Sequence, residues 1–156
     1  RLAELAEEPA KSIWPKIIMA AIPVFLLGAV GWMAYNGEIN ELKQTAQTWL
    51  ILNALVAGLG ILIARGHPLS ILVGALASPI TSLNPTLAAG WFAGYTQLKV
   101  DSPTGKDAQD FLKLDETSLF WKNRVGKVLL VTALGNIGSM VGAWLAGGAI
   151  LGQLIG

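Results

Sequence analysis

The sequence contains no cysteine, a single histidine and few charged residues. Without cysteine the chain forms no disulfide and gives no clue to its redox compartment. One histidine and no thiol also argue against a zinc site, because proteins build such sites from several Cys and His ligands. Charged residues make up 13% of the chain, about half of the roughly 25% found in a soluble domain. The net charge of +1 gives no reason to expect a nucleic-acid partner.

Acidic side chains are missing from every apolar segment, since all ten lie in the polar stretches between the segments. Proton- and cation-coupled transporters usually carry carboxylates at membrane depth, so their absence argues against that mechanism and against an aspartyl intramembrane protease. A serine nucleophile with a nearby base is conceivable only for Ser139 with His67, and no flanking motif supports the pair. We therefore predict no catalytic residue, cofactor or metal ligand in this chain, and interpret His67 as an interfacial residue.

Hydrophobic residues make up 53% of the sequence and gather in long runs. Residues 13–35, 45–64 and 125–148 each reach the roughly 20 residues that cross the ~30 Å hydrocarbon core of a bilayer. We interpret polar residues 1–12 as a tether from a soluble domain that precedes this sequence. The expected fold is an all-α membrane protein with three transmembrane helices.

A fourth apolar segment, residues 68–97, is interrupted by the octapeptide SPITSLNP. Its first proline disfavours helical geometry in the serine before it, and Asn84-Pro85 has the residue types preferred at a helix start. We predict two half-helices, 68–78 and 85–97, joined by PITSLN. Each is roughly 15–20 Å long at ~1.5 Å per residue, which is too short to cross a membrane alone.

The broken segment is either one kinked span or a re-entrant hairpin that leaves on the side it entered. Positive residues accumulate on the cytoplasmic side of membrane proteins. A full span leaves four of the eleven Lys and Arg residues inside and seven outside, or the reverse if the molecule is inverted. A hairpin leaves only Lys43 outside and ten inside: Arg1, Lys11, Lys16, Arg65, Lys99, Lys106, Lys113, Lys122, Arg124 and Lys127. The count predicts the hairpin, with loop 97–124 in the cytoplasm.

Polar residues at the hairpin apex are the candidate site. Irregular backbone at membrane depth must be surrounded by protein or by a water-filled cavity, so the apex should be buried. We expect Thr81 and Ser82 to bond carbonyls at the end of the first half-helix, and Asn84 to cap the second, which starts at Pro85. Asn136, in the last span, is either a hydrogen bonder between helices or part of a polar path. The apex is either structural or, since half-helix N-termini hold substrates in transporters, a site for a small solute or peptide.

Two patterns concern helix contacts outside the apex. TGKD at 104–107 resembles a capping box with Asp in place of Glu, and the apolar spacing that follows predicts a short amphipathic helix on the membrane surface or on the bundle. Gly135, Gly138 and Gly142 form a small-residue stripe with a GxxxG motif, typical of close helix packing. The contact lies either within the subunit or between subunits. We expect a homo-oligomer, with a dimer favoured.

Two stretches, GHPLSILVGALASPITSLNPTLAAGWFAG (66–94) and FWKNRVGKVLLVTALGNIGSMVGAW (120–144), resemble the membrane domain of the TraB/PrgY (pheromone-shutdown) family. The resemblance covers roughly residues 10–150. It implies a soluble N-terminal domain related to the TIKI and erythromycin-esterase-like hydrolases, whose metal-binding Glu and His residues have no counterparts here. It also implies a role in limiting peptide pheromone activity in some bacteria.

Two functions therefore remain in view for this chain in the plasma membrane of a prokaryote. It is either a membrane anchor and oligomerisation module for a hydrolase-like domain, or a conduit or binding site at the apex for a small solute or peptide. The absence of buried charge favours the first.

Overall fold

The computed structural model describes residues 17, 24, 27–28, 30–84, 87–113 and 116–155. Within these ranges the protein is helical and contains no strand, which confirms the expected all-α class. Residues 30–35 are helical. They are followed by six helices: α2 (Ile39–Ile63), α3 (Pro68–Thr81), α4 (Ala89–Asp101), α5 (Gly105–Lys113), α6 (Leu119–Lys122) and α7 (Arg124–Ile155).

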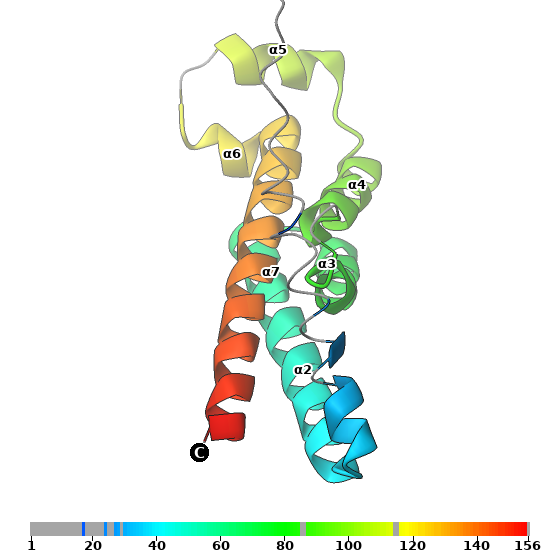
Figure 1. The fold of residues 1–156 in the computed structure, drawn as a ribbon. Helices are drawn as coiled ribbons and strands as arrows, with labels where there is room; N and C mark the ends of the chain where they lie inside the picture. Colours follow the sequence, from blue (N-terminus) through cyan, green and yellow to red (C-terminus); the bar gives the residue numbers. More distant parts are fainter. Residues whose placement is uncertain are drawn as a thin grey trace, which may run out of the picture.

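Two of the described helices are long and apolar enough to cross a membrane, Ile39–Ile63 and Arg124–Gln153. They cross as the two arms of a V and separate toward the C-terminal end of α7 (Figure 1). The first begins before the predicted span 45–64 and ends at Ile63, and the second extends the predicted span 125–148 at both ends. Most of the predicted first span, 13–35, lies outside the described residues.

A hairpin formed by α3 and α4 occupies the predicted broken segment and packs beside α2 and α7 (Figure 1). Its two outer ends meet, because the backbone N–H of His67 donates to Oε1 of Gln97 at 2.8 Å. Gln97 is almost fully buried, and its Nε2 donates to Oδ2 of Asp101 at 2.8 Å. The chain therefore enters and leaves the hairpin at the same end of the bundle.

The boundaries of the two short helices differ from those predicted. The first continues past Ser78 to Thr81 and contains Pro79, because a proline in the last turn removes a single backbone bond and the surrounding helices hold the turn in place. The second begins at Ala89 rather than at residue 85. Residues 85–86, which include the predicted starting proline, lie outside the described residues.

The predicted capping box begins α5. Thr104 N–H and its hydroxyl both donate to Oδ2 of Asp107 at 2.7 Å, and Asp107 N–H donates back to the Thr104 hydroxyl at 3.3 Å. The rings of Phe111 and Phe120 meet edge to face at 5.3 Å, and Trp121 donates its indole N–H to the Ile63 carbonyl at 3.0 Å. Helices α5 and α6 therefore lie across the end of the bundle where α2 ends and α7 begins.

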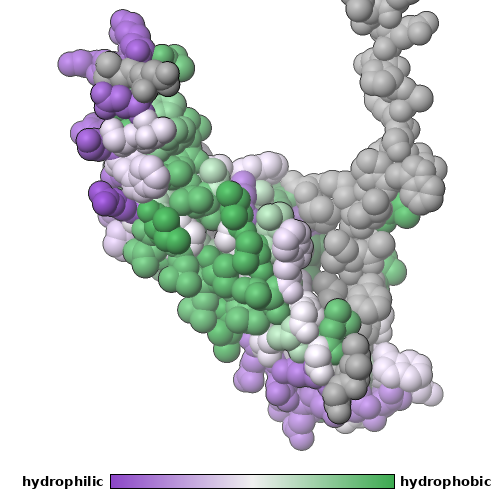
Figure 2. All heavy atoms as spheres, turned by 90° about the vertical axis from the view of Figure 1, so that its left-hand side faces the viewer, coloured by the Kyte–Doolittle hydropathy of each residue, from purple (hydrophilic) through white to green (hydrophobic). Residues whose placement is uncertain are grey.

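The core at this end is built from small and branched apolar side chains of α2, α4 and α7, including Ile61, Ala93 and Val131. Outside this core, large apolar side chains cover the surface of the helices. Figure 2 shows them as an apolar band between two hydrophilic ends. Leu76 is 66% exposed and Trp144 is 70% exposed, in contrast to soluble monomers, which rarely expose large contiguous apolar patches.

Candidate functional site

Four polar side chains from α2, from α7 and from the end of α3 meet in the interior. Ser78 donates its hydroxyl to Oγ of Ser139 at 2.9 Å. Ser82 donates to Oδ1 of Asn53 at 2.6 Å and lies 3.4 Å from the Ser139 hydroxyl. Asn53 and Ser78 are fully buried, and Ser139 is 7% exposed. We call these four residues the polar cluster.

The polar cluster satisfies its own hydrogen-bonding groups. Ser78 donates to Ser139 and Ser82 donates to Asn53, while either hydroxyl can be the donor in the contact between Ser139 and Ser82. The Asn53 amide then donates to the Trp49 carbonyl at 2.9 Å. Buried polar groups are costly when unpaired and stabilising when paired, so these bonds help to hold three helices together.

The carbonyls at the end of α3 are bonded by nearby side chains. The Thr81 hydroxyl lies 3.1 Å from the Ala77 carbonyl and 3.3 Å from that of Ser78, and the Ser82 hydroxyl also contacts the Ser78 carbonyl. Thr81 and Ser82 thus bond carbonyls near the end of α3, but the Ser78 carbonyl is not an open one, because it also accepts the Ser82 N–H at 2.9 Å. In addition, the indole N–H of Trp49 donates to the Pro79 carbonyl at 3.0 Å, so a side chain of α2 bonds a carbonyl in the last turn of α3.

The start of α4 is bonded from α7 rather than from its own loop. Its N-cap is Ala88, which makes no side-chain cap bond, and the prediction that Asn84 caps this helix is therefore wrong. The N–H of Gly90, in the first turn, donates to Oδ1 of Asn136 at 2.7 Å. Asn136 is thus the hydrogen bonder between helices that we had considered, and it performs the task predicted for Asn84.

Glycine is required at position 90 for this contact to form. A methyl group placed there would lie 2.5 Å from Oδ1 of Asn136 and closer still to the carbonyl oxygen of Thr132. On α7, Asn136 and Ser139 are nearly one helical turn apart, so they project from the same face. Asn136 fixes the start of α4, and Ser139 fixes the end of α3. Together they hold both arms of the hairpin apex against α7.

The glycine stripe of α7 packs within the chain. A methyl group at Gly138 would lie 2.6 Å from the Val56 carbonyl oxygen, and one at Gly142 would lie 3.0 Å from Cα of Asn53. Gly135 instead faces α4, where a methyl group would lie 3.0 Å from Cα of Gly90. These close approaches between backbones are what bring Asn53 and Ser139 into contact. Gly138 and Gly142 are therefore not available as a seam between two subunits.

His67 lies far from the polar cluster. It precedes α3 and its Nδ1 accepts the Leu69 N–H at 3.2 Å, so it caps the start of that helix. Ser78 lies eleven residues further along, roughly 16 Å at ~1.5 Å per residue. Because Ser139 bonds Ser78, this separation excludes a Ser139–His67 nucleophile and base. Among the described residues, no group of three or more His, Cys, Asp or Glu side chains is close enough to hold a metal.

The sequence interpretation missed Asn53, Ser78 and Gln97 as buried polar participants, and it considered Ser139 only as a nucleophile. A signal existed for Asn53, which interrupts an apolar run in the same way as Asn136. Gln97 carried no such signal, because it stands beside polar residues at the end of its segment. Its burial depends on the hairpin closing, which brings it against the backbone before α3.

Comparison with known proteins gives one family and one relative. A family model described as "TraB family protein, C-terminal domain" matches residues 14–155. An uncharacterized protein of Methanocaldococcus jannaschii is 31% identical over 140 residues, which is 88% of this chain and 34% of the relative. The chain therefore spans about a third of the length of this curated relative. No solved structure matches the chain.

Proposed function

We infer that this chain, which belongs to the TraB family as its C-terminal domain, is a membrane domain that holds the rest of a longer protein at the plasma membrane of a prokaryote. Two helices of sufficient length and hydropathy support this inference. The apolar band in Figure 2 supports it further, because side chains that are costly to expose to water are stable against lipid. In this proposal the segment 13–35 supplies the third span.

The observation that carries the proposal is the closed hairpin at the cation-rich end of the bundle. His67 and Gln97 join its outer ends, and seven cations stand on the chain around that end. The cations are Arg65, Lys99, Lys106, Lys113, Lys122, Arg124 and Lys127. A re-entrant segment that begins and ends on the cytoplasmic side accounts for both features, since cytoplasmic loops retain positive residues.

Cysteine labelling tests this orientation, because the chain has no cysteine of its own. We expect Asn40→Cys in intact cells to react with an impermeant maleimide, and Ser102→Cys to react only after the cells are opened. Resistance of the protein to alkaline extraction measures membrane integration independently. Labelling of position 102 from outside would refute the re-entrant hairpin, and release by alkali would refute the membrane domain itself.

The anchoring role concerns a protein longer than this chain, as the coverage of its relative indicates. By family resemblance the remainder is a hydrolase-like domain that limits peptide signals. A full-length protein without residues 10–156 should move to the soluble fraction and keep its peptide hydrolysis in solution. Hydrolysis that disappears although the remaining domain is folded would contradict a purely anchoring role.

Oligomerisation is part of the same proposal, and a dimer is favoured. Small residues crowd the membrane segments and permit close helix approach, although Gly138 and Gly142 are already used within the chain. The seam therefore lies on another surface. A single dimeric mass in several mild detergents would support the dimer, and a strictly monomeric mass in all of them would contradict it.

The second function, a solute or peptide site at the apex, has less support. The side chains of the polar cluster are bonded to one another and to backbone carbonyls. A binding site for a polar ligand instead needs groups that reach a partner only when the ligand is present. The geometry favours the structural use of the apex.

A further inference from the structure

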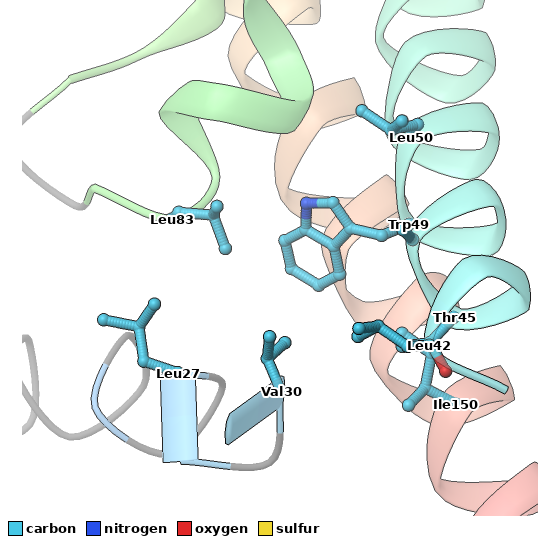
Figure 3. Close-up of a pocket in the computed structure, with 9 residues that line it drawn as sticks. Leu27, Val30, Leu42, Thr45, Trp49, Leu50, Leu83 and Ile150 are labelled. Atoms are coloured by element: carbon cyan, nitrogen blue, oxygen red, sulfur yellow. The ribbon is translucent and has the colours of Figure 1, made fainter. Parts of the chain in front are cut away.

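An apolar cavity of about 440 Å³ adjoins the hairpin apex on the side away from the cation-rich end. It lies between the N-terminal half of α2, the turn after α3, the last turns of α7 and the segment before α2. Side chains from all four places line it, including Leu27, Val30, Leu42, Trp49, Leu83 and Ile150. Figure 3 shows them around a gap, with the Trp49 indole projecting from α2 between Leu50 and Leu42.

We propose that this cavity binds one acyl chain of a membrane lipid from the outer leaflet. The proposal rests on the membrane placement inferred above, which puts the Asn36–Lys43 side of the molecule outside. The wall of the cavity presents carbon atoms, and apolar cavities do not hold water. Hydrocarbon is the occupant whose chemistry matches such a wall.

The volume and the opening of the cavity both fit an acyl chain. The cavity, at about 440 Å³, is far larger than the space that one water molecule needs, so it has room for several methylene groups. Several of its lining residues are also exposed on the outer surface: Leu27 is 72% exposed, Leu50 52% and Leu83 40%. The cavity is therefore continuous with the apolar surface that faces lipid, and a chain can enter from the side.

Trp49 separates the acyl-chain cavity from the polar cluster. Its ring lines the cavity, while its indole N–H is held by the Pro79 carbonyl and its own carbonyl accepts the Asn53 amide. A chain in the cavity packs against the ring in this orientation. The bound lipid thus stabilises the hydrogen bond from the Trp49 indole to the Pro79 carbonyl at the end of α3. Occupancy of the cavity therefore contributes to the stability of the hairpin apex.

Photolabelling tests the proposal. The full chain is reconstituted into phosphatidylcholine vesicles that contain phosphatidylcholine with a diazirine on its acyl chain, illuminated, and mapped by mass spectrometry. We expect labels to concentrate on residues 42–50. Ala46→Phe, which fills the cavity from α2, should lower labelling there several-fold. Leu59→Phe is the matched control, because residue 59 lies on the lipid-facing surface of the same helix and outside the cavity, and it should leave labelling of 42–50 unchanged.

The outcomes separate this proposal from the membrane placement on which it rests. Equal labelling of 42–50 and of the lipid-facing positions, insensitive to Ala46→Phe, would overturn the acyl-chain site. Labelling of other lipid-facing positions with none at 42–50 would overturn it as well, and would point to protein segments or an apolar peptide as the occupant. A protein that does not float with the vesicles would instead contradict the membrane domain. If Ala46→Phe fails to fold, Ala46→Leu should give a smaller decrease in the same direction.

Discussion

Replacing Asn136 with leucine should release the first turn of α4 from α7. The N–H of Gly90 belongs to the first helical turn, where backbone donors have no partner within the helix. Oδ1 of Asn136 accepts this N–H at 2.7 Å. Leucine is close to asparagine in size, so the substitution removes the acceptor and keeps most of the packing. The variant therefore isolates the hydrogen bond.

The expected loss follows from the burial of Gly90, which leaves little solvent to replace the bond. A buried donor left without a partner costs about 1–3 kcal/mol, and a lost helix cap costs about 0.5–2 kcal/mol. These two figures describe one event, so we expect a decrease of about 2 kcal/mol in the free energy of unfolding. For a chain of this length, that lowers the unfolding temperature by about 4–8 °C.

Thermal unfolding in mild detergent measures this decrease, and hydrogen exchange at Gly90 locates it. Met140→Leu is the control, because residue 140 stands on the same helix, is apolar and is 47% exposed. We expect the control to melt like the parent protein and the Gly90 amide to exchange faster only in Asn136→Leu. An Asn136→Leu protein with unchanged melting and unchanged protection of Gly90 would show that this bond does not hold α4.

Two further predictions concern the helix packing and the capping box. Gly138→Ala should lower the unfolding temperature, because its methyl group would clash with the backbone of α2. Gly147→Ala is the control: its methyl group meets no atom within 4 Å, so this change should be neutral or stabilising by about 0.5–1 kcal/mol. Equal effects of the two substitutions would contradict the α2–α7 contact. Hydrogen bonds from the Thr104 backbone and hydroxyl lower the pKa of Asp107 below its ordinary value of 3.8. The ionised carboxylate therefore supports α5 fully above pH 3.8, and this support is lost as the pH falls through the lower folded pKa. Amide signals of α5 should show this transition in the parent and not in Asp107→Asn, and an identical acid response in both would refute the assignment.

Composition and local patterns predicted most of the helices, because the features that determine them lie within each segment. Long apolar runs with few charges give helices that can cross a membrane whatever their neighbours are. The interruption in the fourth segment was visible because proline and asparagine change backbone preferences locally. The capping box of α5 was predicted from four adjacent residues and is confirmed by three hydrogen bonds.

The start of α4 could not be predicted by the same reasoning. Capping preferences describe bonds between residues a few positions apart, whereas Gly90 and Asn136 are separated by 46 positions. A pattern rule therefore assigned the cap to the nearest suitable residue, Asn84. The contact depends instead on helix packing. Gly90 and Gly135 allow α4 and α7 to approach closely, so that the side-chain oxygen of Asn136 on α7 reaches a backbone N–H of α4.

The polar residues of the apex raise the question of whether they serve binding or folding, and the bonds among the described residues favour folding. Helices in lipid gain little from burying apolar surface against one another, so their association depends on close packing and on hydrogen bonds. The two glycines of the α7 motif supply the packing, and the polar cluster supplies the bonds at the same depth. A short hairpin whose arms cannot cross the membrane alone needs such fixed contacts at its buried end, where unpaired backbone groups are most costly. In the membrane domain that we propose, the serine and asparagine residues of the polar cluster therefore fix the broken helix against its neighbours, and the apolar cavity beside Trp49 is the proposed site for a ligand.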